Sequence, residues 1–79
     1  MNYDDAPEEF LDPITTLLME DPVKLPSSNI VVDRNTIEKH LLSDPTDPFN
    51  RSKLSKEMLI PCDELRANIN EYKKTKENK

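Results

Sequence analysis

The chain has 79 residues, of which 34% are hydrophobic, and carries a net charge of −5 at neutral pH, so we expect one small domain with a modest core. The negative charge disfavours nucleic acid as a partner, because binding to phosphates requires positive charge. The apolar runs are far shorter than the roughly 20 residues that span a bilayer, and the N-terminus is acidic where a signal peptide would be basic, so we expect a cytoplasmic or nuclear protein with no membrane contact.

The N-terminal part predicts a flexible lead-in followed by an ordered loop. Residues 1–6 have acidic side chains and no periodic apolar pattern, which indicates a frayed end. From Phe10 to Pro22 the sequence reads FLDPITTLLMEDP, and its prolines at positions 13 and 22 exclude a long helix. We therefore expect an ordered loop held by its apolar side chains.

A β-hairpin and a helix are predicted next. The segments VKL and IVV flank PSSN, in which Pro26 pre-sets its φ angle and Asn29 tolerates the positive φ that glycine usually provides. Asp33 is the expected N-cap of a helix of about ten residues over RNTIEKHLLS, with Ile37 and Leu41 on one face.

A second loop follows this helix. The nonapeptide SDPTDPFNR, Ser43–Arg51, contains two Asp-Pro steps, and its Asp47-Pro48-Phe49 echoes Asp12-Pro13-Ile14 in the first loop. Two loops built alike could form one groove. Chance is the competing explanation, because the Asp-Pro step occurs four times in the chain.

The C-terminal part predicts a second helix. A short strand or turn at Lys53–Leu54 and one helical turn near Glu57 come first, and a helix is then expected from Asp63 to Lys74. Its apolar stripe consists of Cys62, Leu65, Ile69 and Tyr72. The expected core of the whole domain consists of Phe10, Leu18, Val23, Ile30, Val32, Ile37, Leu65 and Ile69.

Cysteine usage excludes the usual supports of a small domain. Cys62 is the single cysteine, so no internal disulfide forms, and Cys62 and His40 are too few for the four ligands of a structural zinc site. Hydrogen bonds and ion pairs among Asp, Asn, Ser and Arg must then hold the loops. We expect no metal and no cofactor, and no catalytic role for His40 or Cys62.

These residues together resemble the U-box, the zinc-free relative of the RING finger in ubiquitin ligases. The resemblance covers about residues 7–75 and is carried by DPV at Asp21, DR at Asp33 and TDPFNR at Thr46; EFLDP and TDPFNR further resemble the U-box of large ubiquitin chain-elongation factors, or E4 enzymes. It implies a small α+β, RING-like fold with two ordered loops, a short hairpin, a central helix and a C-terminal helix. Residues 76–79 would form a disordered tail, and the chain would be part of a longer protein.

The resemblance implies a RING-type ubiquitin ligase module without a covalent intermediate. The domain would bind a ubiquitin-conjugating enzyme with its thioester-linked ubiquitin, and would promote transfer of ubiquitin to lysine on substrates held by the rest of the full-length protein. It would act as a monomer. Arg51 would be the catalytic residue, because its planar group can donate hydrogen bonds to enzyme and ubiquitin at once. The alternative is a non-catalytic docking domain that uses the same groove.

The other site residues are implied in the same way. Ile14, Pro48 and Phe49 would line the groove for the conjugating enzyme, with Leu41 or Leu42 as its floor. Two polar braces would replace the zinc ions of a RING finger: the candidates are Ser27, Ser28, Asp33 and Arg34 for the first, and Asp47, Asn50 and Glu57 for the second. Composition alone favours core positions for Ile14 and Phe49. Even with the resemblance, the alternative for Arg51 is an ordinary solvated or ion-pairing residue.

Overall fold

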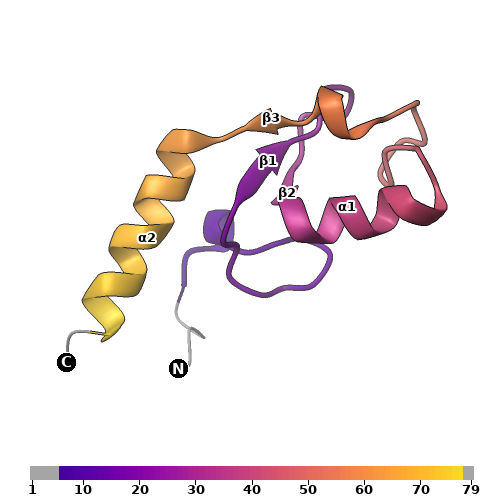
Figure 1. Cartoon of the computed structure of the whole chain (residues 1–79). Helices are drawn as coiled ribbons and strands as arrows, with labels where there is room; N and C mark the ends of the chain where they lie inside the picture. Colours follow the sequence, from indigo (N-terminus) through magenta and orange to yellow (C-terminus); the bar gives the residue numbers. More distant parts are fainter. Residues whose placement is uncertain (1–5, 78–79) are drawn as a thin grey trace.

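The computed structural model describes residues 6–77, and it has the expected α+β arrangement (Figure 1). The elements are the 3-10 helix η1 (Glu8–Phe10), strands β1 (Pro22–Lys24) and β2 (Val31–Asp33), helix α1 (Arg34–Ser43), the 3-10 helix η2 (Lys56–Met58), strand β3 (Ile60–Pro61) and helix α2 (Asp63–Glu77). The first loop (residues 11–21) connects η1 to β1, and the second loop (residues 44–55) connects α1 to η2. Residues 1–5 of the expected lead-in lie outside the described residues.

The sheet contains the predicted hairpin and one further strand. Strands β1 and β2 pair antiparallel with Val23 opposite Val32, and β3 pairs on the other side of β1 with Ile60 opposite Lys24. The strand order is therefore β2-β1-β3. Strand β3 was not predicted, because two residues are too few for an alternating pattern. Its Pro61 is compatible with the position at the edge of the sheet.

Helix α1 has the predicted length, but its N-terminus differs from the prediction in one respect. Asp33 occupies the N-cap position with an extended backbone, yet its side chain makes no capping hydrogen bond. The carboxylate accepts the backbone N–H of Asp21 instead, at 3.1 Å. Asp33 therefore ties the end of the first loop to the start of α1.

The main core lies between the sheet and α1. It consists of Val23, Leu25, Val32, Ile37, Leu54 and Leu59, with Ile30 and Leu41 packed against it. The predicted core residues Val23, Val32, Ile37 and Ile69 are fully buried, whereas Phe10, Leu18 and Leu65 are half-buried. Leu54 and Leu59 were missed because they lie in loops, where no periodic pattern reveals burial. Leu25 was missed although it alternates with Val23 in the predicted strand segment VKL.

Helix α2 extends away from the sheet and gives the molecule its elongated shape, 43 × 20 × 18 Å (Figure 1). It continues to Glu77, three residues beyond the predicted end at Lys74, and so includes residues 76–77 of the expected disordered tail. Residues 78–79 lie outside the described part of the chain. Ile69 and Met19 are buried, but they do not belong to the main core. No helix within residues 6–77 combines the length and apolar character needed to cross a bilayer.

Candidate functional site in two braced loops

Three turns of the domain share one backbone conformation. They are the first-loop turn (Asp12–Leu17), the hairpin turn (Leu25–Ile30) and the second-loop turn (Asp47–Ser52). In each, the second residue is proline, and the N–H of the fifth residue donates to the carbonyl of the first at 2.7, 2.8 and 2.7 Å respectively. The N–H of the first residue donates to the carbonyl of the sixth at 2.8, 2.9 and 2.8 Å. One structural unit is thus used three times.

The fifth residue of each turn has a positive φ angle. The angles are 62° at Thr16, 61° at Asn29 and 63° at Arg51. Asn29 was predicted to adopt this conformation, which asparagine tolerates well. For other residues it costs roughly 1–2 kcal/mol, and β-branched threonine is especially unfavourable there. The chain contains no glycine, so Thr16 and Arg51 occupy these strained positions, and both are exposed.

The first-loop and second-loop turns also share a buried aspartate. Oδ1 of Asp12 accepts the N–H of Ile14 at 2.7 Å, and Oδ1 of Asp47 accepts the N–H of Phe49 at 2.8 Å. The two aspartates are 1% and 0% exposed. The echo between the two tripeptides therefore reflects a shared geometry, in which a buried carboxylate fixes the residue two positions ahead.

A first brace attaches the first loop to the start of α1. Oδ2 of Asp12 accepts the N–H of Asp33 at 3.0 Å, near the beginning of the loop. At its end, the Arg34 N–H donates to the Asp21 carbonyl at 2.9 Å, and the Arg34 Nε–H donates to Oδ2 of Asp21 at 2.8 Å. The beginning of the first loop is thus fixed to Asp33, and its end is fixed to Asp33 and Arg34.

A second brace joins the second loop to the hairpin turn. The Ser27 hydroxyl lies 3.0 Å from Oδ2 of Asp47 and 3.4 Å from Oδ1 of Asn50. Burial raises the pKa of the Asp47 carboxyl, but hydrogen bonds from the Phe49 and Asn50 amides and from the Ser28 and Ser27 hydroxyls outweigh it, so the pKa lies below its usual value. The carboxylate is therefore ionised at neutral pH and holds the loop through charge-assisted hydrogen bonds.

His40 provides a further attachment for the second loop. Its Nε2–H donates to the Thr46 carbonyl at 2.9 Å, directly before Asp47. The Leu54 N–H donates to the Pro45 carbonyl at 3.0 Å, and Thr46 pairs with Lys53. This attachment was not predicted, because the sequence gives no sign of a contact between a helix and the loop that follows it.

The grouping of the braces differs from the expected one. Ser27 and Ser28 act on Asp47 in the second brace, because the hairpin turn lies against the second loop. Asp33 and Arg34 pair with Asp12 and Asp21, which were not among the candidates. Their Asp-Pro steps, like that of Asp47, were the signal that could have identified them. Glu57 is exposed in η2 and has no hydrogen bond or ion pair within the described residues.

The expected groove residues occupy both loops and the end of α1. Ile14 is 46% exposed on the first loop, and Phe49 is 40% exposed on the second, next to half-buried Pro48. Leu42 is 89% exposed, whereas Leu41 packs against the main core. Neither Ile14 nor Phe49 is a core residue.

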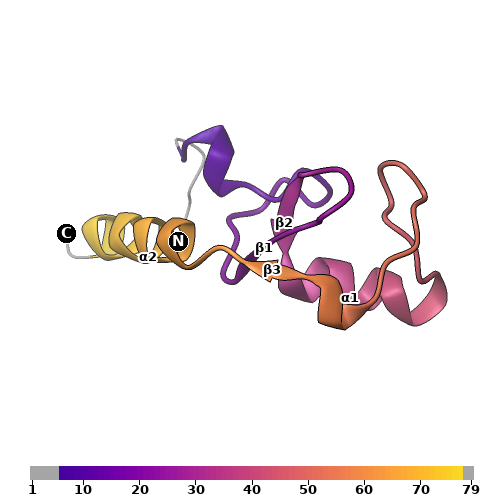
Figure 2. The ribbon, with the colours of Figure 1, turned by 90° about the horizontal axis from the view of Figure 1, so that it is seen from above.

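The two loops lie at opposite ends of α1. The first brace holds one loop at Asp33 and Arg34, and the other loop begins after Ser43, so about 15 Å of helix separates the attachment points. Viewed from above, the second loop rises from the far end of α1 on the same side as η1 (Figure 2). A hollow of about 460 Å³ lies between the first loop and α1. It is lined by Thr15, Leu17, Leu18, Glu20, Asp33, Asn35, Thr36 and Lys39, and not by the expected groove residues.

Arg51 is exposed at the fifth position of the second-loop turn. Its N–H donates to the Asp47 carbonyl at 2.7 Å, so its backbone is held by the residue that carries the second brace. Within residues 6–77, no group of three or more His, Cys, Asp and Glu side chains is placed to hold a metal ion.

A family model described as the U-box domain matches residues 6–78. The chain belongs to the U-box family. The U-box extends over almost the whole chain, and it includes both braces, both loops and helix α2. The resemblance noted from the sequence is thereby confirmed.

Several curated proteins contain a similar U-box. The "Probable ubiquitin conjugation factor E4" of Arabidopsis thaliana is 57% identical over 75 residues, 95% of this chain and 7% of that protein. "Ubiquitin conjugation factor E4 A" of Mus musculus is 57% identical over 70 residues, 89% of this chain and 7% of that protein. "E4 ubiquitin-protein ligase UFD2" of Saccharomyces cerevisiae is 53% identical over 76 residues, 96% of this chain and 8% of that protein. The chain thus spans less than a tenth of the length of these relatives.

Proposed function

We propose that this U-box is a ubiquitin ligase module, which binds a ubiquitin-charged conjugating enzyme and promotes transfer of ubiquitin to lysine during chain elongation. The observation that carries the proposal is the pair of turns of one geometry that expose Ile14 and Phe49 while a buried aspartate fixes each. The names of the relatives support it, since they are called E4 ubiquitin conjugation factors and an E4 ubiquitin-protein ligase.

The two loops suit the binding of a preformed partner surface. Ile14, Pro48 and Phe49 offer apolar contacts on turns whose backbones are already held by hydrogen bonds. A loop that is ordered before binding loses less conformational entropy when the partner arrives. We therefore assign the contact with the conjugating enzyme to these residues, with Leu41 or Leu42 completing it at the end of α1.

Arg51 has the properties required of the residue that bridges the enzyme and its ubiquitin. Its side chain is exposed, and its backbone is held in a strained conformation, which is typical of functional positions. The guanidinium offers five donors in one plane and stays charged at any working pH. A tenfold acceleration requires about 1.4 kcal/mol, which a few oriented hydrogen bonds can supply by restricting the charged conjugate to reactive geometries.

The transfer proposed here is non-covalent with respect to this domain. Burial raises the pKa of the Cys62 thiol and is the largest effect; the charge of Lys24 lowers it by less, and the charge of Asp63 adds a still smaller increase. A thiol with a raised pKa is a poor nucleophile at neutral pH. The cysteine that carries ubiquitin then belongs to the conjugating enzyme, and we place substrate recognition in the remainder of a full-length factor.

Discharge of ubiquitin from a charged conjugating enzyme to free lysine tests this proposal. Wild type should accelerate discharge, and Arg51→Ala should abolish the acceleration while it keeps the affinity for the enzyme. Lys53→Ala is the matched control, because Lys53 is an exposed cation of the same loop. If the wild type binds the conjugating enzyme but does not accelerate discharge, the ligase function is rejected and the alternative of a non-catalytic docking domain is supported.

A further inference from the structure

The base of the first loop is closed by two residues that face each other. The Met19 N–H donates to the Phe10 carbonyl at 2.9 Å, and Leu11 pairs with Leu18 one position further into the loop. Met19 is 1% exposed and Phe10 is half-buried. The position of the turn that presents Ile14 therefore depends on how firmly this base is held.

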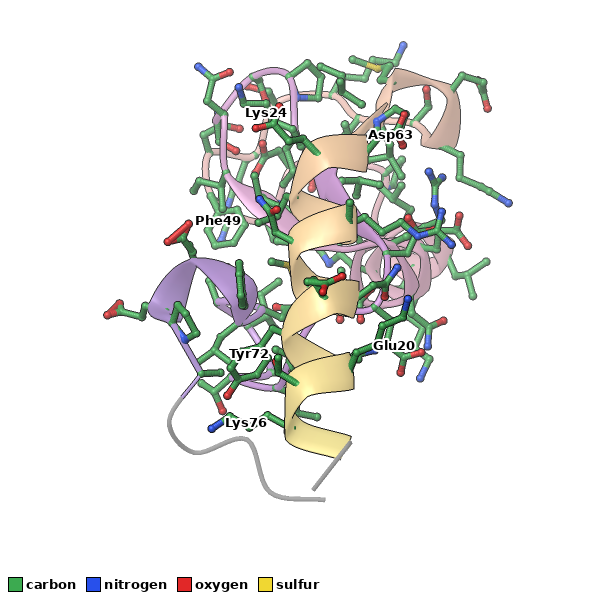
Figure 3. All side chains as sticks on the ribbon, turned by 90° about the vertical axis from the view of Figure 1, so that its left-hand side faces the viewer. Glu20, Lys24, Phe49, Asp63, Tyr72 and Lys76 are labelled. Carbon is green, nitrogen blue, oxygen red and sulfur yellow. The ribbon has the colours of Figure 1, made fainter. Side chains whose placement is uncertain are left out.

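Helix α2 holds the base from outside the loop. The rings of Phe10 and Tyr72 meet edge to face, with centroids 5.7 Å apart and planes at 64°, which is a favourable arrangement for two aromatic rings. Tyr72 follows fully buried Ile69 by three residues, so both side chains lie on one face of α2. Figure 3 shows Tyr72 on the side of α2 that faces η1, the element that ends in Phe10.

The two loops rest on different apolar groups. The second loop contains Leu54, which is part of the main core. Met19 and Ile69, at the base of the first loop and on α2, are buried outside that core. A change at Tyr72 should therefore act on the first loop and leave the second unchanged.

We propose that Tyr72 is a positioning residue for ubiquitin transfer, which fixes the first loop, and hence Ile14, through its ring contact with Phe10. This inference rests on the proposed function. Because Arg51 lies on the other loop, loss of the Tyr72 ring weakens capture of the charged conjugating enzyme without slowing the step that Arg51 promotes. Helix α2 thereby contributes to partner binding without touching the partner.

Lysine discharge measured over a range of charged-enzyme concentrations separates these effects. Tyr72→Ala should raise the concentration for half-maximal rate roughly 3- to 10-fold, the effect of losing one aromatic pair, with the maximal rate unchanged. Tyr72→Phe keeps the ring, and its half-maximal concentration should lie closer to that of the wild type than to that of Tyr72→Ala. An unchanged half-maximal concentration in Tyr72→Ala, or a lower maximal rate, would overturn the proposal.

Two control variants isolate the contact with Phe10. Lys76 lies 5.6 Å from the centre of the Tyr72 ring, so Lys76→Ala removes this cation and keeps both aromatic rings. Glu71→Ala changes an exposed residue of the same helix. Both variants should shift the half-maximal concentration by less than Tyr72→Ala does, and a shift in either that equals the shift in Tyr72→Ala would contradict a role for the ring pair.

Amide hydrogen exchange distinguishes loosening of one loop from general destabilisation. In Tyr72→Ala the Met19 amide should exchange faster, while the Asp47 amide, which donates to the Ser52 carbonyl, keeps its rate. Equal acceleration at both amides overturns the positioning role. Arg51→Ala in the lysine-discharge assay distinguishes failure of the proposed function from failure of the role of Tyr72. Unchanged discharge by Arg51→Ala rejects the proposed function. If Arg51→Ala slows discharge and Tyr72→Ala has no effect, only the role of Tyr72 is rejected.

Discussion

The Ser27 hydroxyl donates a hydrogen bond of 3.0 Å to Oδ2 of Asp47, and this bond joins the hairpin turn to the second-loop turn. The other oxygen of the same carboxylate accepts the N–H of Phe49 at 2.8 Å. One buried side chain therefore both shapes the second-loop turn and fixes its place in the domain. The position of Arg51 depends on this arrangement, because its N–H is bound to the Asp47 carbonyl.

Removal of the Ser27 hydroxyl should destabilise the domain. In Ser27→Ala, Oδ2 of the buried Asp47 carboxylate loses the hydrogen bond from the Ser27 hydroxyl. We therefore expect the free energy of unfolding to fall by about 1–3 kcal/mol. Urea denaturation followed by circular dichroism measures this change. Ser52→Ala, at an exposed position of the second loop, is the control and should differ from the wild type by less than about 0.5 kcal/mol. Equal stability of the two variants would show that the hydrogen bond between Ser27 and Asp47 contributes nothing.

Asp47 should make the stability depend on pH in the acid range. Its pKa in the folded state lies below the unfolded value, so its contribution is complete above about pH 4 and is lost as the pH falls through the folded pKa. Urea midpoints measured from pH 7 to pH 2 should therefore decrease less steeply for Asp47→Asn, which cannot be protonated. If the two proteins have parallel acid profiles, Asp47 does not carry this dependence.

Replacement of Thr16 by glycine should stabilise the fold. Glycine adopts a φ of 62° without steric strain, and the gain should be about 0.5–1 kcal/mol after the greater entropy of the unfolded chain is subtracted. Thermal unfolding measures it. Ser52→Gly, outside the positive-φ positions, should instead lower the melting temperature. A destabilised Thr16→Gly would mean that the threonine side chain contributes more than its backbone costs.

Truncation of Ile14 should weaken the contact with the conjugating enzyme. Because the side chain is 46% exposed, Ile14→Ala should lose about 1–3 kcal/mol of binding free energy while the unfolding transition changes little. Titration calorimetry gives the affinity. Met58→Ala removes a similarly exposed apolar side chain, 41%, from η2 and is the control. Identical affinities of wild type and Ile14→Ala would place the contact elsewhere on the domain.

The features that the sequence predicted well are those that depend on neighbouring residues. Pro26 and Asn29 define the hairpin turn, and Arg34–Ser43 matches the predicted helix, which Pro45 prevents from continuing. Ile69 lies buried on the predicted face of α2.

The features that were missed depend on distant residues. Ser27 and Asp47 are separated by 20 positions, and no local pattern distinguishes this pairing from one with Asp33. The burial of Asp12 likewise follows from its bond to Asp33, 21 positions away. Leu54 enters the core because of the path of the second loop, and β3 forms because β1 offers an open edge.

The composition of the three turns affects the denatured ensemble as well. Each turn has a proline at its second position, and the chain as a whole has seven prolines and no glycine. Such a polypeptide samples fewer backbone conformations when it is unfolded, so it loses less conformational entropy on folding. The restricted unfolded chain thus offsets part of the stability that a small apolar core cannot provide. We expect refolding to tolerate shortening of hydrophobic side chains better than the insertion of flexible residues into these turns.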